Sequence, residues 1–345
     1  MSTPRRLKIA LIGLGRLGAI RASILAFQQP RIELVAACYT KPGSDEWAAA
    51  NLPPSVKYYA DPEDCMKNSG AEAVLISTVT ATHAPLICMG LDLGLHVMCE
   101  KPISVDLITT AEVLAKARSN PHLKFLVPFC RRYDDSYRAA KEMVENRSLG
   151  EIHAVQTTCI DQQDPTGFFI SFSAQSGGIF VDMGVHDIDI GRYYLDVTSG
   201  LANPKKQVNR VVAMGQQAVY GELAKYGDCD NGWGMVEFAN GKVLTSHLGR
   251  TLTNGFESCT RVCGTKAHSV INGNSTINRV ESFLNDLAEF SASVLDDKPL
   301  TCTPDDAYEA AKIATALQYS FRNGVPVYFD DEGLPILETS KANVV

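Results

Sequence analysis

The feature that most constrains the fold stands near the start of the chain, in "LKIALIGLGRLGAIRASILAFQ". Residues 7–12 form an apolar run typical of a buried strand, and a helical pattern follows the glycine-rich turn. Gly13, Gly15 and Gly18 give the spacing G-x-G-x-x-G, which suits a tight turn, close approach of a phosphate, and close packing of helix on strand. The pattern predicts a dinucleotide site at the start of the helix, where the helix dipole attracts phosphate.

Later segments extend this start to an α/β fold with two domains. The apolar runs in "AEAVLISTVT" and "LHVMCEKP" predict further strands of a parallel sheet that has helices on both faces. After Gly150 the pattern becomes one of alternating strands, with an Asn-Gly hairpin turn in "ANGK" and a capped helix in "TPDDAYEAAKIATALQYSFRNG". Because 345 residues exceed one comfortable core, we predict two domains. Residues 1–129 are predicted to form a dinucleotide-binding Rossmann domain with a doubly wound parallel sheet. Residues 130–345 are predicted to form an α+β domain with a large open, mainly antiparallel sheet, for substrate binding and oligomerisation.

The end of the second predicted strand, in "RIELVAACYTK", bears on the choice of dinucleotide. A site selective for NAD normally has an Asp or Glu there, which binds the ribose 2′-hydroxyl and would repel a 2′-phosphate. This chain instead has Cys38, Tyr39, Thr40 and Lys41. The sequence therefore favours NADP(H) over NAD(H), with Thr40 and Lys41 as contacts of the 2′-phosphate. The alternative for Lys41 is a solvated loop lysine.

Other predicted cofactor contacts lie at the carboxyl ends of the parallel strands, where sheets of this kind bind ligands. Thr78 and Thr80 follow one strand, and the sequence "EKP" follows the next. Arg16 and His83 each have an alternative, as a solvent-facing side chain and as a helix-start residue. The full predicted cofactor-binding set is Gly13, Gly15, Arg16, Leu17, Tyr39, Thr40, Lys41, Thr78, Thr80, His83, Glu100 and Lys101.

A second polar cluster lies in "SGGIFVDMGVHDIDIGRYYL", a run that is otherwise mostly apolar. Asp182, His186 and Asp189 are spaced four and then three residues apart, which predicts one helix with these side chains on a single face. The face is either a solvated stripe of an amphipathic helix or a catalytic stripe lining a cleft. Asp189 has the weaker claim, because a buried acid can serve to hold Arg192 or a neighbouring loop.

Four motifs, "GLGRLG", "EKP", "FCRRYDDSYRAAKEMVENRSLGEI" and "GGIFVDMGVHDIDIGRYY", follow one another in an order and spacing that resemble the Gfo/Idh/MocA oxidoreductase family over nearly the whole chain. The resemblance extends to the inositol 2-dehydrogenases of that family and their fungal relatives. It implies an NAD(P)-dependent dehydrogenase or reductase that acts on the CH–OH group or carbonyl of a sugar, polyol or cyclitol. It also implies Lys101, Asp182 and His186 as the catalytic set. Tyr39 departs from the family pattern, because NAD-dependent inositol enzymes have an acid there.

The implied reaction gives each member of this set a chemical task. Removal of a hydride from an alcohol carbon requires that the hydroxyl proton also leaves, and an imidazole suits this transfer near pH 7. His186 is therefore predicted to be the general base in oxidation and the general acid in reduction. The ammonium of Lys101 would stabilise charge that develops on the reacting oxygen. Asp182 would either hydrogen-bond the substrate or orient the imidazole.

Polar residues that follow two predicted strands are candidates for substrate contacts. The segment "CIDQQDPTGFF" carries Asp161 and Asp164, and "FCRRY" carries Arg131 and Tyr133. Such groups bind hydroxyl-rich ligands, although acids and amides also occur in ordinary turns. The predicted substrate-binding set is Arg131, Tyr133, Asp161, Asp164, Asp182 and His186.

The composition argues against several other classes of partner. A net charge of −7 disfavours a nucleic-acid surface, which needs clustered basic residues. No run of about 18 apolar residues predicts a membrane span. The ten cysteines include no C-x-x-C pair, so we expect free thiols, no metal site and a cytoplasmic location. The family resemblance implies a homodimer or homotetramer formed through the C-terminal sheet.

Two functions of other classes remain as alternatives. Some proteins of this fold bind a dinucleotide and act as regulators without catalysis, but such a sensor has no chemical need for Lys101, Asp182 and His186 together. An NAD-dependent glycosidase uses the same hydride transfer transiently, before elimination. It would retain its cofactor through purification and show no net reduction.

Overall fold

Residues 5–39, 43–273 and 279–337 are described by the computed structural model of this chain. The chain divides into two compact units. Unit 1 comprises Met1–Asp134 and Asn278–Tyr308, and unit 2 comprises Asp135–Ile277 and Glu309–Val345. The functional division predicted at residue 129 stays a prediction, and the structure adds that a segment from late in the sequence belongs to unit 1.

Unit 1 is built on a parallel sheet. Within the described residues its six strands have the order β3-β2-β1-β4-β5-β6, which confirms the predicted doubly wound sheet. The order reverses between β1 and β4, so the carboxyl ends of these two strands mark the place where such sheets bind ligands. The strands are β1 (Leu7–Ile12), β2 (Ile32–Cys38), β3 (Lys57–Tyr59), β4 (Ala73–Ile76), β5 (His96–Cys99) and β6 (Phe125–Leu126).

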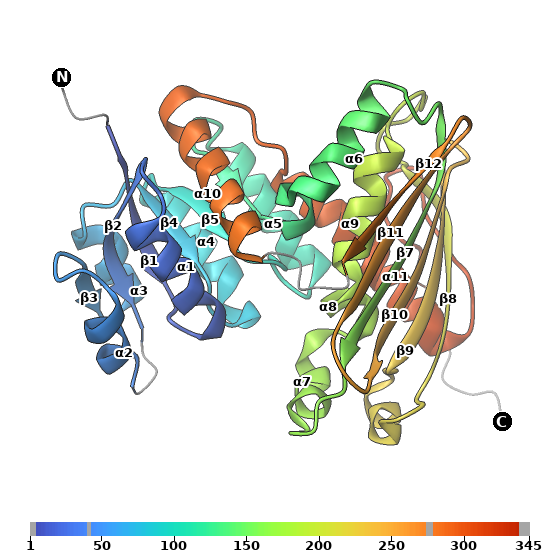
Figure 1. Cartoon of the computed structure of the whole chain (residues 1–345), viewed down its shortest axis with the longest axis horizontal. Helices are drawn as coiled ribbons and strands as arrows, with labels where there is room; N and C mark the ends of the chain where they lie inside the picture. The colour runs from blue at the N-terminus through green and yellow to red at the C-terminus, as the bar shows by residue number, and fades with distance from the viewer. Residues whose placement is uncertain (1–4, 40–42, 274–278, 338–345) are drawn as a thin grey trace. The chain divides into compact units, whose positions relative to one another are not determined.

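The late segment of unit 1 is helix α10 (Arg279–Asp296). Figure 1 shows it in orange among the blue and cyan elements of unit 1, and it packs against α1 (Arg16–Phe27). The sequence analysis did not anticipate this return of the chain, because nothing local in the segment indicates its partner. The other helices described in unit 1 are α2 (Ser44–Asn51), α3 (Pro62–Asn68), α4 (His83–Asp92) and α5 (Leu107–Arg118), with the short 3-10 helices η1 (Thr80–Thr82) and η2 (Cys130–Tyr133).

Unit 2 is built on a mixed sheet. In the part of the chain that the structure describes, seven strands have the order β12-β11-β7-β10-β9-β8-β13. The pair β7 and β10 is parallel and the other neighbouring pairs are antiparallel, which confirms the predicted mainly antiparallel sheet. The predicted hairpin joins β9 to β10 through Gly241, whose φ of 81° suits glycine. The strands are β7 (Ile152–Gln162), β8 (Val208–Gln216), β9 (Asn231–Phe238), β10 (Val243–Leu252), β11 (Glu257–Gly264), β12 (His268–Gly273) and β13 (Val327–Tyr328).

The helices of unit 2 follow the same chain order. They are α6 (Asp135–Glu145), α7 (Phe168–Ser176), α8 (Ile179–Asp182), α9 (Gly184–Leu195), η3 (Gly221–Tyr226) and α11 (Pro304–Asn323), whose first residues count with unit 1. The predicted start of α11 is confirmed, since Thr303 and Asp306 exchange side-chain and backbone hydrogen bonds there. Gly324, with a φ of 66°, follows its last residue.

The two faces of the unit 2 sheet differ in polarity. Helix α9 packs on β7 and β10, and Leu244 of β10 lies close to Gly191 of the helix. On the opposite face, Met214 of β8 stands beside Trp233 of β9, whose ring stacks on His247 with centroids 4.5 Å apart. Further apolar side chains exposed on this face are Val212, Met235 and Val270. A patch of exposed apolar side chains on a sheet face is typical of an interaction surface.

Two further properties concern the whole described chain. Among residues 5–39, 43–273 and 279–337, no helix is long and apolar enough to cross a membrane. All ten cysteines are free thiols in the structure. The predicted cytoplasmic location stays a prediction.

Candidate active site

The glycine turn of unit 1 is shaped by close backbone contacts at two positions and open at a third. A Cβ on Gly13 would lie 2.6 Å from the carbonyl oxygen of Ser77, and one on Gly18 would lie 1.9 Å from the carbonyl oxygen of Gly13. By contrast, nothing lies within 4 Å of the place that a Cβ on Gly15 would occupy. The turn is therefore packed against β4 on one side and leaves space beside Gly15.

The space beside Gly15 opens at the start of α1. Gly15 is the residue before the first turn of this helix, and that turn has neither a side-chain cap nor an acidic residue. The free N–H groups of a helix start bind anions, and the helix dipole adds to the attraction. Arg16 is exposed here and Leu17 is half-buried. These residues fit the pyrophosphate of a dinucleotide, which the first backbone N–H groups of α1 would hold.

At the end of β2 the structure describes only part of the predicted ribose site. Thr40 and Lys41, the predicted 2′-phosphate contacts, lie outside the described residues. The backbone N–H of Tyr39 donates to the carbonyl oxygen of Tyr59 at 3.1 Å. Burial raises the pKa of Tyr39, and the negative charge of Asp45 in the first turn of α2 adds to this shift. An acid that β2 itself lacks is thus supplied near Tyr39 by the next helix.

At the end of β4, His83 joins two predicted parts of the cofactor site. It is buried and is the first residue of α4, which agrees with the helix-start alternative. Its Nδ1 lies 2.8 Å from the carbonyl oxygen of Pro102, and its Nε2 lies 3.2 Å from the carbonyl oxygen of Thr78. His83 therefore ties the end of β4 to the "EKP" turn. Thr78 and Thr80 are half-buried at the same strand end, and their contact with a cofactor stays a prediction.

The "EKP" turn follows β5 directly. The backbone N–H of Glu100 donates to the carbonyl oxygen of Ile76 at 3.0 Å, and the carboxylate of Glu100 accepts hydrogen bonds from Arg21. Lys101 is half-buried, and the bond between Lys101 and Pro102 is cis. The predicted residues Glu100 and Lys101 therefore lie at the carboxyl edge of the parallel sheet, as expected.

Two predicted substrate contacts turn out to be core residues of unit 1. Arg131 and Tyr133 lie in η2 and are 3% and 0% exposed. The hydroxyl of Tyr133 donates to Glu289 at 2.9 Å, and burial raises the pKa of this phenol well above its usual value. A buried phenol that already donates its proton has none to offer to a substrate. This corrects the predicted role of Tyr133, whose ring and hydroxyl hold α10 instead.

In unit 2 the predicted single helix is two helices. α8 ends at Asp182 and α9 begins at Gly184, with Met183 between them. A Cβ on Gly184 would lie 2.8 Å from the side chain of Leu248, so α9 approaches β10 closely at this point. The prediction of one uninterrupted helix was therefore wrong. The cause is a packing contact with a distant strand.

Burial separates the three predicted polar residues of this segment. Among residues 179–192, all of which are described, Asp182 and His186 are half-exposed and the other side chains are buried. Asp189 is fully buried, so its predicted place on one exposed face with the other two was wrong. Two polar side chains that alone reach the surface of a buried segment fit a functional role better than a solvated stripe.

Arg250 is a site residue that the sequence analysis missed. Its Nη2 donates to Oδ2 of Asp182 at 2.6 Å, and its guanidinium lies 4.0 Å from the ring centroid of Phe169. It stands near the end of β10, so a basic residue at the end of a predicted strand was the available signal. As a carboxylate, Asp182 offers hydrogen-bond acceptors, and Arg250 fixes one of its two oxygens.

The remaining predicted substrate contacts lie at the end of β7. Asp164 accepts hydrogen bonds from Thr166 and from the backbone N–H of Phe169, and these bonds lower its pKa. Its carboxylate closes the turn before α7, which supports the ordinary-turn alternative for this residue. Asp161 is half-exposed in β7, and its contact with a substrate stays a prediction.

The predicted catalytic set is divided between the two units. Lys101 belongs to unit 1, whereas Asp182 and His186 belong to unit 2, where they occupy neighbouring turns. Within the described residues, no group of three or more His, Cys, Asp or Glu side chains is placed to hold a metal ion.

Comparison with known proteins gives matches along most of the chain. Residues 7–127 match the model of an oxidoreductase family with an NAD-binding Rossmann fold, and residues 137–270 match the GFO/IDH/MocA C-terminal domain. A myo-inositol 2-dehydrogenase of Thermotoga maritima is 30% identical over 269 residues, which cover 75% of this chain and 73% of the relative. A scyllo-inositol 2-dehydrogenase (NAD(+)) of Bacillus subtilis is 28% identical over 94% of this chain and 97% of its own length.

A solved structure has the same fold over nearly the whole chain. It is a scyllo-inositol dehydrogenase from Lactobacillus casei with bound NAD(H) and scyllo-inositol. The TM-score is 0.84 with 28% sequence identity, and the match covers 94% of this chain and 99% of that one.

Proposed function

Because the chain belongs to the Gfo/Idh/MocA family of oxidoreductases, we propose that it transfers hydride between a nicotinamide dinucleotide and an alcohol or carbonyl carbon of an inositol-like polyol. The family matches confirm the predicted resemblance and the prediction of an oxidoreductase. The observation that carries the proposal is that Asp182 and His186 alone are half-exposed in the buried segment 179–192. The inositol dehydrogenases among the relatives support the substrate class.

In the proposed reaction the dinucleotide, when bound, supplies the hydride acceptor in oxidation and the donor in reduction. His186 takes the hydroxyl proton in oxidation and returns it in reduction. The ammonium of Lys101 stabilises negative charge on the reacting oxygen. Asp182, held by Arg250, accepts a hydrogen bond from a substrate hydroxyl or orients the imidazole of His186.

The test of these roles is a pair of substitutions in the full chain. Lys101→Ala and His186→Ala are expected to lower kcat by about 100-fold or more, because each removes a group that acts on the reacting hydroxyl. Fluorescence titration is expected to give an unchanged Kd for the dinucleotide. Scyllo-inositol and myo-inositol, each with NAD⁺ and NADP⁺, are the probes. Wild-type turnover in both variants would remove both residues from the mechanism.

For the cofactor we retain the preference for NADP(H), which rests on the lack of an acid in β2 and on Lys41. Asp45 weighs against this preference, because its charge lies near Tyr39 and would repel a 2′-phosphate there. A titration with NADPH and with NADH separates the two effects. Tighter binding of NADPH supports the preference, and equal or tighter binding of NADH gives the chain to NAD(H).

The two alternative functions make different predictions in the same assays. A dinucleotide-binding regulator would bind the cofactor without turning over any polyol. An NAD-dependent glycosidase would cleave a glycoside without net reduction and would keep its cofactor through purification. Net oxidation of an inositol by the purified chain would exclude both.

We also propose that unit 2 forms a homodimer, or a homotetramer, through the open face of its sheet. Met214, Trp233 and Met235 are 69%, 42% and 53% exposed on this face, although large apolar side chains are costly to leave in water. Light scattering on the purified chain should give the mass of an oligomer. The double substitution Met214→Glu and Met235→Glu should give the mass of a monomer, and an unchanged mass would contradict the proposal.

A further inference from the structure

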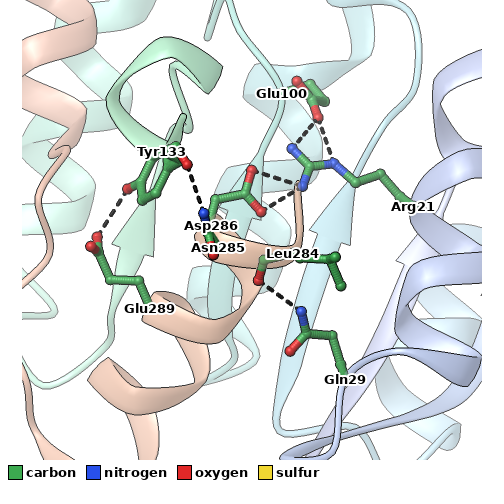
Figure 2. Close-up of polar contacts among 8 residues, drawn as sticks. All are labelled: Arg21, Gln29, Glu100, Tyr133, Leu284, Asn285, Asp286 and Glu289. Atoms are coloured by element: carbon green, nitrogen blue, oxygen red, sulfur yellow. Dashed lines mark hydrogen bonds and ion pairs between the residues drawn. The ribbon is translucent and has the colours of Figure 1, made fainter. Parts of the chain in front are cut away.

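Arg21 joins two carboxylates that lie far apart in the sequence but together in unit 1 (Figure 2). Its Nη1 donates to both oxygens of Asp286, at 2.6 and 2.8 Å. Its Nε and Nη2 donate to Oε1 of Glu100, at 3.0 and 2.8 Å. Arg21 lies in α1, Asp286 lies in α10, and Glu100 follows β5. The guanidinium therefore connects three elements of unit 1.

The network is buried and its charges are unequal in number. The side chains of Arg21 and Asp286 are 1% and 0% exposed, and that of Glu100 is 12% exposed. The guanidinium also lies 3.9 Å from the ring centroid of Phe283. A two-pronged contact with one carboxylate already balances the charge of an arginine. Asp286 is therefore sufficient for the burial of Arg21, and the second contact serves to hold Glu100.

Helix α10 is fixed by contacts outside this network. The side chain of Gln29 donates to the carbonyl oxygen of Leu284 at 2.7 Å. The side chain of Asn285 donates to the carbonyl oxygen of Tyr133 at 2.9 Å, and Figure 2 shows both contacts beside the network. These bonds flank Asp286 in the sequence. They place its carboxylate as a fixed anchor for the guanidinium.

Glu100 is the first residue of the turn that carries Lys101. Its backbone N–H donates to the carbonyl oxygen of Ile76, and two residues later the carbonyl oxygen of Pro102 faces Nδ1 of His83 at 2.8 Å. Lys101 thus lies between two residues whose backbones are attached to unit 1. The network adds a hold on the side chain of the first.

We propose that Arg21 is a positioning residue for Lys101: anchored on Asp286, it holds Glu100 and thereby fixes the turn from which Lys101 acts. This rests on the proposed function, in which Lys101 stabilises charge on the reacting oxygen. Such stabilisation depends on placement, since a shift of about 1 Å can cost about 100-fold in rate. Loosening Glu100 is therefore expected to lower kcat and to leave dinucleotide affinity unchanged.

A second ion pair of α10 provides a matched control. Arg31 donates to both oxygens of Asp296, at 2.5 and 2.9 Å, across the same 265 positions of sequence that separate Arg21 from Asp286. Both side chains of this second pair are 41% exposed. Its loss removes one attachment of α10 and leaves the network at Glu100 intact.

The experiment compares Arg21→Lys with Arg31→Lys in the full chain. Lysine keeps the positive charge, but an ammonium does not reproduce the two-pronged contacts of a guanidinium. With inositols as probes, Arg21→Lys is expected to lower kcat by about tenfold or more and to leave the dinucleotide Kd unchanged. Arg31→Lys is expected to leave kcat unchanged. If Arg21→Lys does not fold, Glu100→Gln gives the same readout, because it leaves the buried pair of Arg21 and Asp286 in place.

A double substitution separates positioning from an independent effect. If the network acts through Lys101, Glu100→Gln lowers kcat in the wild-type chain and adds no loss to the residual turnover of Lys101→Ala. Equal losses in both backgrounds, or wild-type kcat in Arg21→Lys and Glu100→Gln, overturn the inference and leave the role of Lys101 standing. Full activity of Lys101→Ala overturns the proposed function, and this inference with it.

Discussion

An arginine–carboxylate pair accompanies the proposed catalytic side chains in each unit, and the two pairs differ in burial. In unit 1, Arg21 and Asp286 are 1% and 0% exposed. In unit 2, Arg250 and Asp182 are 10% and 26% exposed. In the first pair the carboxylate supports a neighbouring segment, whereas in the second the carboxylate is itself proposed to act.

The difference in burial predicts different consequences for the same kind of substitution. A charge left without its partner in a dry core cannot be hydrated, so loss of one member of the buried pair costs stability. A partly exposed carboxylate can exchange its arginine for water at little cost in stability. The buried pair should therefore be detected mainly by unfolding, and the exposed pair mainly by kinetics.

The largest expected effect is that of Asp286→Ala. Removing this carboxylate leaves the guanidinium of Arg21 buried beside Glu100 alone, and we expect the free energy of unfolding to fall by about 3–5 kcal/mol. Urea unfolding at pH 8 measures it. Arg250→Ala is the control and should cost less. A smaller loss for Asp286→Ala than for the control would break the comparison.

Arg250→Ala should act on turnover. Its hydrogen bond to Asp182 is charge-assisted, and loss of such a bond is worth about 1.5–3 kcal/mol, or roughly 10–100-fold in kcat/KM. Steady-state kinetics with an inositol measure this change. Arg250→Lys should recover part of the activity, because an ammonium can still donate to the carboxylate. Wild-type kcat/KM in Arg250→Ala would show that Asp182 needs no partner.

The pH dependence of stability gives the next effect in size. Burial raises the pKa of Asp286 to about 7, against about 3.9 in an unfolded chain, although Arg21 opposes the shift. Between about pH 4 and pH 7 the folded chain then holds a proton that the unfolded chain has released. The free energy of unfolding should fall as pH rises across this window, with a slope of at most about 1.4 kcal/mol per pH unit.

The matched variant for this pH effect is Asp286→Asn, which cannot titrate. Urea unfolding of both chains at several pH values between 4 and 8 gives a difference curve that isolates this carboxyl from other titrating groups. The curve should change across the window and be flat above it. Parallel stability curves for the two chains would show that Asp286 stays ionised throughout.

The smallest expected effect is that of Arg31→Ala. This arginine and Asp296 form an exposed pair on α10, and exposed pairs contribute little because water screens them. The urea midpoint should lie within error of the wild-type value. A shift as large as that of Asp286→Ala would mean that attachment of α10, and not burial of charge, sets stability.

Local patterns predicted much of this molecule. The glycine turn, the Asn-Gly hairpin and the start of α11 are each specified by a few neighbouring residues, and the structure has all three. Asp182 and His186 were predicted from spacing and resemblance, and both are half-exposed as a site requires.

Long-range packing accounts for what the sequence did not predict. The break at Met183 accompanies the approach of Gly184 to Leu248, and the burial of Tyr133 depends on α10. The partner of Arg21 lies 265 residues away. No periodicity or motif near these residues carries such information, because each contact is chosen by the folded surfaces that meet there.

The return of α10 to unit 1 also sets an order of events during synthesis. Residues 135–277 leave the ribosome before Asp286 does, which takes about 7–30 s at about 5–20 residues per second. During that time Arg21 has no carboxylate from α10, so a nascent unit 1 cannot complete its interior. A gene fragment that stops at residue 134 would encode this incomplete state permanently. An expressible unit 1 therefore needs α10 rejoined to it by a linker.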